Sequence, residues 1–407
     1  MAEIILRKAS HLSRPFIRPY KIVRHIWFQA GGPLCRMLRT NRRTHYSGTG
    51  RLQLNANAPE RTSIMNTKFT FSAGVWNLNT GSDPFGPAVR PDKEFAEKCR
   101  TFKRLGFDFV QLHDDDAVPM DVPPNLVEFY TKKLKTICED NGVGVEFIAP
   151  RLWEDPEFAD GSFTSNNARA REKAKDRAKR SLEIMNILGT DRLVLWPARE
   201  GTYIRESKDA VRSFDLFLEY CNFILETDPR ARILAEMKPN EPMDLMYLPS
   251  TGHMLAMCYL TRDPSRTGVL IEAAHCILLG LDPSDEMAYA LWHKKLWSVH
   301  LNDQNGLKYD QDKTFGSVDI RRAFNAVEVL VRNDYGTNGE IVGLDVKAMR
   351  TQPAEMAWQH LENSKEVFDR LVQVSATIDR TEWQQYVEAQ DYEGLEMFIL
   401  RNLMGAR

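Results

Sequence analysis

Hydrophobic and polar positions follow two alternating patterns along the chain from Lys68 onward. Short apolar runs are typical of buried strands, and they are separated by longer stretches whose apolar positions recur at helical spacing. The segment 91–106 begins with proline and ends with glycine, the usual start and stop of a helix, and 166–189 and 319–334 behave similarly. The predicted strands are 68–76, 107–113, 143–150, 191–198, 232–238, 268–275, 296–302 and 340–349.

This order of elements predicts the fold class. Repeats of strand and helix, eight within roughly 300 residues, are what a (β/α)₈ TIM barrel requires. A doubly wound sheet usually has fewer strands, and no G-x-G-x-x-G opens a helix here. We therefore expect an α/β protein, a (β/α)₈ TIM barrel over 65–379 with a C-terminal helical extension. The tail 380–407 has apolar residues at near-helical spacing, so it packs either on a neighbouring subunit or on its own barrel.

Length and composition allow a large core but hide a charge asymmetry. The 407 residues are 43% hydrophobic and carry a net charge of −2. Residues 1–64 hold twelve Lys and Arg against Glu3 and Glu60, so the remaining chain is acidic. We expect 1–64 to be a basic, disordered N-terminal arm. Its composition also fits a transit peptide, and an upstream extension of a protein that starts at Met65 is the favoured explanation.

The same features narrow the expected partners and location. An acidic body disfavours nucleic acid as the main partner, because phosphate contacts need Lys and Arg. Apolar patches in the arm are interrupted by charge, so no membrane span is expected. The six cysteines are scattered without a C-x-x-C pair, which fits a reducing cytoplasm and no disulfide framework.

Charged residues gather where the predicted strands end. In a TIM barrel the active site is built at these C-terminal ends. Alternation within pairs such as 236 and 238 predicts side chains on the same side of a strand. Each group alone has an ordinary structural explanation, such as an interior ion pair, a core histidine or, for the acidic run after His113, a solvated turn. The groups are His113 to Asp116, Glu236 with Lys238, Glu272 with His275, His300 with Asn302, Asp310 with Asp312, and Asp345 with Lys347.

So many carboxylates at one barrel mouth need compensating charge. We expect two divalent cations per subunit, because they would neutralise most of it. Oxygen-rich ligands favour Mg²⁺, while His275 and His300 shift the preference towards Mn²⁺ or Co²⁺. Such a site, with a lysine beside it, can polarise adjacent oxygens of a substrate.

The motifs at these positions resemble those of the xylose (glucose) isomerases, particularly the shorter-chain group. Their order and placement match from about Phe69 to Lys347. The longest, E-x-KPNEP and LN-x-QNG-x-KYDQD, make coincidence improbable. The motifs are DPFG (83–86), HDDD (113–116), W-x-x-REG (196–201), E-x-KPNEP (236–242), E-x-x-H (272–275), LN-x-QNG-x-KYDQD (301–312) and D-x-K (345–347).

The resemblance implies an aldose–ketose isomerase that converts D-xylose to D-xylulose, and D-glucose to D-fructose, by ring opening and a metal-assisted hydride shift. His113 would guide ring opening with Asp116 fixing its tautomer, and Lys238 would hydrogen-bond the C1 carbonyl. The first metal would take Glu236, Glu272, His300 and Asp345; the second would take Glu272, His275, Asp310 and Asp312. Sugar contacts would come from Trp76, Trp153, Trp196 and Lys347, and from Phe85 of a neighbour in a homotetramer.

Departures from the family pattern bear on the metal and the sugar. The family usually has aspartate at the position of His300, so one negative charge is lost and softer ions gain over Mg²⁺. Asp303, usually glycine, could partly compensate. Trp153 replaces phenylalanine and makes a bulkier wall, and Met237 replaces proline.

Three other functions stay open. A related barrel sugar isomerase or epimerase would act on a different sugar by proton transfer, and would incorporate deuterium from D₂O. A metal-dependent nuclease of the same barrel type would need three histidine-rich zinc sites and a basic groove, which the acidic body disfavours. A non-catalytic sugar-binding relative would turn over no aldose.

Overall fold

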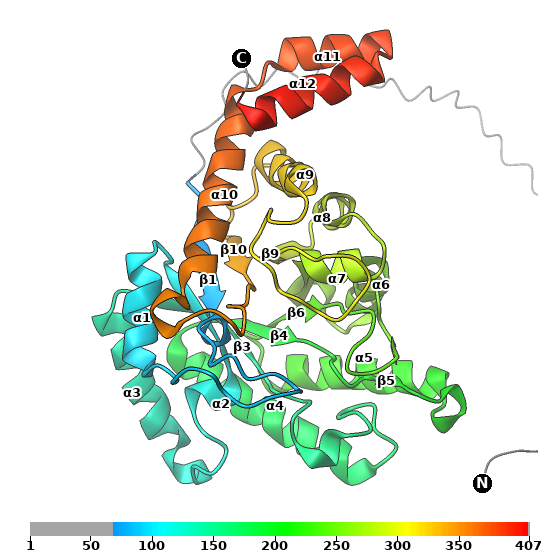
Figure 1. Ribbon diagram of the computed structural model, residues 1–407. Helices are drawn as coiled ribbons and strands as arrows, with labels where there is room; N and C mark the ends of the chain where they lie inside the picture. Colours follow the sequence, from blue (N-terminus) through cyan, green and yellow to red (C-terminus); the bar gives the residue numbers. More distant parts are fainter. Residues whose placement is uncertain (1–67, 406–407) are drawn as a thin grey trace, which may run out of the picture. The chain divides into compact units, whose positions relative to one another are not determined.

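A ring of parallel strands forms the centre of the protein (Figure 1). The computed structural model describes residues 68–405, and the predicted arm 1–64 lies outside the described residues. Eight strands close in the order β1-β10-β9-β8-β6-β4-β3-β2, which confirms the predicted (β/α)₈ barrel. They are β1 (Phe71–Gly74), β2 (Phe109–His113), β3 (Gly144–Ala149), β4 (Arg192–Leu195), β6 (Arg232–Glu236), β8 (Thr267–Glu272), β9 (Leu296–Leu301) and β10 (Ile341–Leu344).

Helices surround this ring and close the core against its outer face. The predicted helices 91–106, 166–189 and 319–334 appear in shortened form, as α1, α4 and α9. The α-helices are α1 (Phe95–Arg104), α2 (Asp114–Ala117), α3 (Val127–Asp140), α4 (Ala168–Leu188), α5 (Ala210–Thr227), α6 (Thr251–Leu260), α7 (Ala273–Leu278), α8 (Pro283–Trp292), α9 (Ile320–Arg332), α10 (Gln359–Thr377), α11 (Arg380–Ala389) and α12 (Tyr392–Met404). Short 3₁₀ helices are η1 (Val75–Asn77), η2 (Pro124–Leu126), η3 (Pro156–Phe158), η4 (Arg205–Ser207), η5 (Pro264–Arg266) and η6 (Ala354–Met356).

Local chemistry explains where the elements end. Asn167 and Asp209 begin α4 and α5 as N-caps, since each side chain accepts a hydrogen bond from a backbone N–H of the first turn. Gly189 ends α4 in the left-handed region, at φ 87°, where glycine is favoured. Strand β6 stops at Glu236, because Pro239 lacks a backbone donor and disfavours a continuing strand. A small antiparallel sheet of β5 (Gly201–Thr202) and β7 (Leu245–Met246) was not predicted.

The C-terminal extension folds onto its own chain. In Figure 1 α10 leads away from the barrel to α11 and α12. Phe398 and Ile399 of α12 are buried. Glu328 of α9 accepts hydrogen bonds from Arg380 at the start of α11, at 2.5 and 3.0 Å. The described residues thus give the tail contacts with its own helices, while its contact with a neighbouring subunit stays a prediction.

Two remaining expectations concern cysteines and membranes. The five cysteines within 68–405 are all buried and free of disulfides, and Cys35 lies outside this range. Within the same range, no helix is both long enough and apolar enough to cross a bilayer.

Candidate metal and sugar site

Seven predicted ligands meet at the C-terminal mouth of the barrel. Glu236 and Glu272 are the last residues of β6 and β8, and His300 lies in β9. Potential ligand atoms fall into three groups, each within 4.8 Å, and Glu272 belongs to all three. The groups are Glu236, Glu272 and His275; Glu272, His300 and Asp345; and Glu272, Asp310 and Asp312. The shared carboxylate has the place that a bridging ligand would take.

The ligands predicted for the first metal, Glu236, Glu272, His300 and Asp345, are arranged around the imidazole of His300. Its Nδ1 lies 3.7 Å from Glu236 Oε1, 3.6 Å from Glu272 Oε2 and 3.8 Å from Asp345 Oδ2. This nitrogen is buried and has no hydrogen-bond partner. Atoms bound to one small divalent ion at about 2.1 Å lie about 3.0–3.4 Å apart, so the four atoms leave a space close to what an ion needs.

The ligands predicted for the second metal are Glu272, His275, Asp310 and Asp312, and two lysines lie beside them. His275 Nε2 is 3.1 Å from both Glu272 Oε1 and Asp310 Oδ2. Lys238 Nζ donates to Asp310 Oδ2 at 2.9 Å, while Lys347 Nζ is 2.7 Å from Asp312 Oδ2. Lys238 is buried, whereas the Lys347 side chain is half exposed.

The pKa values reveal a deficit of positive charge. Burial lowers the pKa of His275, but the carboxylates of Glu272 and Asp310 outweigh it and raise that pKa to about 9. Burial raises the pKa of Asp312, and the charge of Asp310 adds to this effect. Burial also lowers the pKa of His300, but the neighbouring glutamates outweigh it and hold this pKa well above its usual value. The raised pKa values mean that these side chains hold protons, and bound divalent cations would supply the missing positive charge instead.

Unpartnered polar atoms test whether these residues fit a metal. His275 Nδ1, His300 Nδ1 and Asp310 Oδ1 are buried without hydrogen-bond partners, although such atoms are normally paired. All three belong to the ligand groups. Nitrogen and carboxylate donors together suit Mn²⁺ or Co²⁺ as well as Mg²⁺. The residues therefore fit divalent cations.

A histidine and three tryptophans form the other part of the site. His113 Nδ1 is 2.7 Å from Asp116 Oδ2 and 2.9 Å from Arg151 Nη2, and the tautomer that donates Nδ1–H to the carboxylate leaves Nε2 available. Trp76 and Trp153 contact the His113 ring at centroid distances of 4.4 and 5.3 Å. Trp196 packs on Trp153 at 4.5 Å, and Lys238 Nζ lies 5.1 Å from the Trp196 ring. The aromatic rings thus connect His113 to the ligand cluster.

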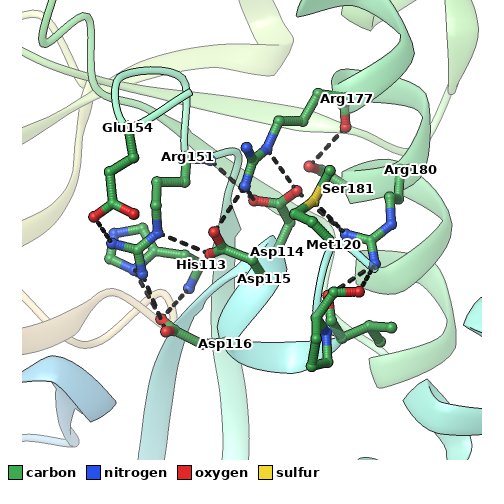
Figure 2. A network of polar contacts seen from close by, with 12 residues as sticks. His113, Asp114, Asp115, Asp116, Met120, Arg151, Glu154, Arg177, Arg180 and Ser181 are labelled. Carbon is green, nitrogen blue, oxygen red and sulfur yellow. Dashed lines mark hydrogen bonds and ion pairs between the residues drawn. The ribbon is translucent and has the colours of Figure 1, made fainter. Parts of the chain in front are cut away.

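Arginine side chains compensate the negative charge of the acidic run, Asp114 to Asp116 (Figure 2). Arg177 binds fully buried Asp114 through two hydrogen bonds of 2.9 Å and reaches Asp115 at 2.9 Å. Arg151 Nε donates to Asp115 Oδ1 at 2.8 Å, and its Nη2 to Asp116 Oδ1 at 3.1 Å. Asp114 and Asp115 therefore form ion pairs with arginines and belong neither to a solvated turn nor to the ligand groups. Only Asp116 contacts the predicted catalytic histidine.

Comparison with known proteins places this geometry in a family. A profile described as xylose isomerase-like TIM barrel matches residues 99–333. The chain belongs to this family. It is 33% identical to the xylose isomerase of Thermus thermophilus over 296 residues, which are 72% of this chain and 75% of the relative. Against the xylose isomerase of Thermus caldophilus the identity is 32% over the same length and shares.

Solved structures with the same fold are more distant in sequence. The 3-keto-D-glucoside 4-epimerase YcjR from E. coli has a TM-score of 0.54 at 14% identity, over 74% of this chain and all of its own. An L-ribulose 3-epimerase has a TM-score of 0.55 at 12% identity, over 76% of this chain and 96% of its own. Both similarities concern the fold alone.

Two expectations about strand placement require correction. Lys238, Asp345 and Lys347 lie beyond the strand ends, and Asp310 and Asp312 lie in the loop between β9 and α9, so strand alternation does not bring them together. His275 lies in α7, not in a strand.

Asp303 does not compensate for His300. Its carboxylate accepts hydrogen bonds from the backbone N–H groups of 304, 318 and 319, which shape the loop before α9. Phe85 is 98% exposed on a turn, where Asp83 and Gly86 exchange backbone hydrogen bonds. Its contact with a neighbouring subunit stays a prediction.

Sequence reasoning missed the residues that hold the ligands in place. Asn302 Nδ2 donates to Glu272 Oε1 at 2.9 Å and to the Asp345 carbonyl at 3.0 Å. Asn77 Nδ2 and Trp76 Nε1 both donate to Asp345 Oδ1 at 2.9 Å. The predicted sugar wall Trp76 therefore also orients a ligand. Asn302 stood at a predicted strand end, which was the one available signal.

Proposed function

We propose that the protein is a metal-dependent aldose–ketose isomerase that converts D-xylose to D-xylulose, and D-glucose to D-fructose. One observation carries the proposal: Glu272 joins three groups of ligand atoms, and Trp76 links this cluster to the His113–Asp116 pair. The family membership and the names of the Thermus relatives support the same reaction.

The roles of the side chains follow from their contacts. Asp116 holds the Nδ1–H of His113, so Nε2 can exchange a proton with the ring oxygen or hydroxyl of a closed sugar. Lys238, buried beside Asp310, would hydrogen-bond the open-chain carbonyl at C1 and stabilise charge that develops there. Two divalent cations, when bound, would supply positive charge that polarises the sugar oxygens before the hydride shift.

The aromatic residues would keep the reacting carbons dry. Trp76, Trp153 and Trp196 form a nearly continuous apolar wall between His113 and Lys238. Excluding water protects the carbonyl from hydration and from proton exchange. Lys347 lies at the rim and would contact the distal part of the sugar. A homotetramer in the cytoplasm completes the proposal.

A second candidate is a sugar isomerase or epimerase that acts on a different sugar by proton transfer. The specific observation in its favour is the fold likeness to proteins named as 3-keto-D-glucoside 4-epimerase and L-ribulose 3-epimerase. The substitution of the family's usual aspartate by His300 also points to an altered site.

Turnover of D-xylose or D-glucose in D₂O tests the first candidate and distinguishes a hydride shift from proton transfer. The metal-free protein is supplied with Mg²⁺, Mn²⁺ or Co²⁺, incubated with D-xylose or D-glucose, and the products are read by NMR. A hydride shift gives ketose with little solvent deuterium at C1, whereas proton transfer labels it. Glu272→Gln, which alters the shared ligand, should abolish turnover and serves as the control. Absence of turnover with either aldose and all three metals contradicts the isomerase.

A further inference from the structure

A layer of polar side chains fills the barrel directly beneath His300. His300 Nε2 lies 3.1 Å from Gln111 Oε1, and Gln111 itself is completely buried in β2. The Gln111 amide nitrogen lies 2.9 Å from Ser72 Oγ and 3.0 Å from Glu146 Oε2. Nothing in the proposed reaction uses these residues, and a TIM barrel interior is normally filled by branched apolar side chains.

Glu146 determines which way the Gln111 amide points. Its carboxylate is buried and receives donors from Ser72, Gln111 and Ser298, with Arg192 at 3.4 Å. Gln111 Nε2 donates to Glu146 Oε2 and to Ser72 Oγ, so the NH₂ group of Gln111 faces Glu146. The carbonyl oxygen Oε1 then faces His300. Since Oε1 also only accepts, His300 Nε2 must carry the hydrogen and donate it.

Since Nε2 donates to Gln111, the nitrogen that a cation can bind is Nδ1, once the cation displaces the proton that the carboxylates of Glu236, Glu272 and Asp345 favour there. An imidazole that donates one N–H to a fixed acceptor and presents its other nitrogen is the usual arrangement of a metal-bound histidine. Here the acceptor is an amide held by a buried acid. The acid is Glu146 in β3, on the far side of Gln111 from the ligand cluster.

A glycine makes room for this contact. Gly343 in β10 pairs with His300 in the sheet register. A Cβ at Gly343 would lie 2.7 Å from Gln111 Nε2 and 2.9 Å from His300 Cδ2, closer than real Cβ contacts allow. The backbone of β10 can therefore lie against the His300–Gln111 pair only with glycine at this position.

We propose that Gln111 and Glu146 are positioning residues that fix His300 as an Nδ1 ligand, so that the first cation site prefers Mn²⁺ or Co²⁺ to Mg²⁺. This inference rests on the cation site of the proposed function and not on its sugar chemistry. A neutral nitrogen replaces one carboxylate, and Mg²⁺ gains least from nitrogen ligands. Rigid support matters, because the ring could otherwise turn its N–H towards the cation.

The test is calorimetric titration of the full-length, metal-free protein with MnCl₂ and with MgCl₂, without sugar. Gln111→Met keeps the length of the side chain but removes its hydrogen bonds. It should weaken Mn²⁺ binding at one site by about 10–100-fold, the usual effect of losing such support, and Mg²⁺ binding by less. Glu146→Gln, which lets the Gln111 amide turn over, should act in the same direction and provides a second variant if the first fails to fold.

A double-mutant cycle separates positioning from general damage. His300→Asp should move the preference towards Mg²⁺, and adding Gln111→Met to it should change the Mn²⁺/Mg²⁺ affinity ratio little further. Tyr220→Phe, which removes a buried hydrogen bond to the Ala174 carbonyl, is the matched control and should leave the ratio unchanged.

The outcomes distinguish this inference from the proposed reaction. If folded Gln111→Met and Glu146→Gln bind both ions like the wild type, or if the effects of Gln111→Met and His300→Asp add fully, the positioning role is wrong, whatever the activity. If the ratios shift as described but no aldose is turned over, the isomerase proposal fails and the positioning role stands.

Discussion

Individual acids in this protein are balanced in two different ways. Asp114 is completely buried and meets the guanidinium of Arg177 in a bidentate pair. Glu272 is equally buried, but it faces two imidazoles and other carboxylates, and burial raises its pKa well above the usual value. A fixed arginine completes the first arrangement, whereas the second needs a mobile cation. The difference separates structural from functional acids.

A buried histidine outside the ligand cluster should make stability depend on pH. His360 of α10 donates from Nε2 to the Asn77 carbonyl at 2.8 Å, and burial lowers its pKa to about 4. The unfolded chain binds a proton near pH 6.5, so the folded state loses stability as pH falls from about 6.5 to about 4, by about 3 kcal/mol in total. Above pH 6.5 this contribution is fully present.

The measurement compares the free energy of unfolding at pH 7.5 and 4.5 in chelator. His360→Asn should lose less stability over this range than the wild type, by about 2–3 kcal/mol. His253→Asn, at an exposed histidine, is the control and should follow the wild type. If His360→Asn keeps the full pH dependence of the wild type, the buried imidazole is not its source.

Single residues also show where sequence reasoning stops. Glu236 and Glu272 could be predicted because they directly follow apolar runs, and all strands of a barrel end at one mouth. Gln111 and Arg151 could not, since their roles depend on partners 35 or more positions away. No local pattern marks a glutamine that faces a histidine on another strand. Such contacts require the register of the closed barrel.

At the scale of elements, the sequence predicted the order of strands but overestimated their length. Every predicted run contains a barrel strand, yet β6 and β8 stop at the first acid of their motifs. Beyond Glu272 the chain turns into α7, where Ala273 and Ala274 favour helix. The ligands converge because loops and short helices begin at a common edge. The prediction that the ligands share one site was therefore right, but strand alternation was the wrong reason for it.

The stability of the protein should depend on the ion pair between Arg177 of α4 and Asp114 of α2. Arg177→Met would leave Asp114 buried without its bidentate partner, and breaking such a pair costs about 3–5 kcal/mol. Arg180, at 3.6 Å, offers only a weaker replacement. Denaturant unfolding measures this cost. Arg169→Met on the same helix is the matched control: that arginine pairs with Glu157 but is 82% exposed, so its loss should cost under about 1 kcal/mol.

Equal destabilisation by the two substitutions would mean that the buried pair does not hold α2 in place. A larger effect of Arg177→Met should be accompanied by reduced turnover, because α2 carries Asp116 and hence orients His113. Arg177→Lys should recover the stability only in part, since lysine cannot form the bidentate contact.

At the scale of the whole molecule, the C-terminal helices and one turn raise the question of assembly. The extension packs on its own chain through Phe398, Ile399 and the Glu328–Arg380 pair. The turn at Phe85 is different. A backbone bridge and the Asp83 side chain hold its shape, while the ring has no cover from residues 68–405. We expect a neighbouring subunit to contact this ring.

Phe85→Ala should therefore affect assembly and turnover but not the folding of the subunit. Because the ring is 98% exposed, its removal should change the unfolding free energy by less than about 0.5 kcal/mol. Sedimentation equilibrium should show weaker association, and kcat/KM for D-xylose should fall. Phe129→Ala, at a phenylalanine of α3 that is 63% exposed, is the control and should change neither.

Mixing subunits provides the decisive form of this experiment. Phe85→Ala subunits keep their ligands, and Glu272→Gln subunits keep Phe85, so a mixed assembly contains sites with intact ligands beside an intact neighbouring phenylalanine. Activity should rise above that of either variant alone when the two are mixed and allowed to exchange subunits. In mixed assemblies, the Phe85→Ala subunits have neighbours that supply Phe85. If activity in assemblies shown to be mixed is nevertheless unchanged, Phe85 does not complete the site of a neighbour.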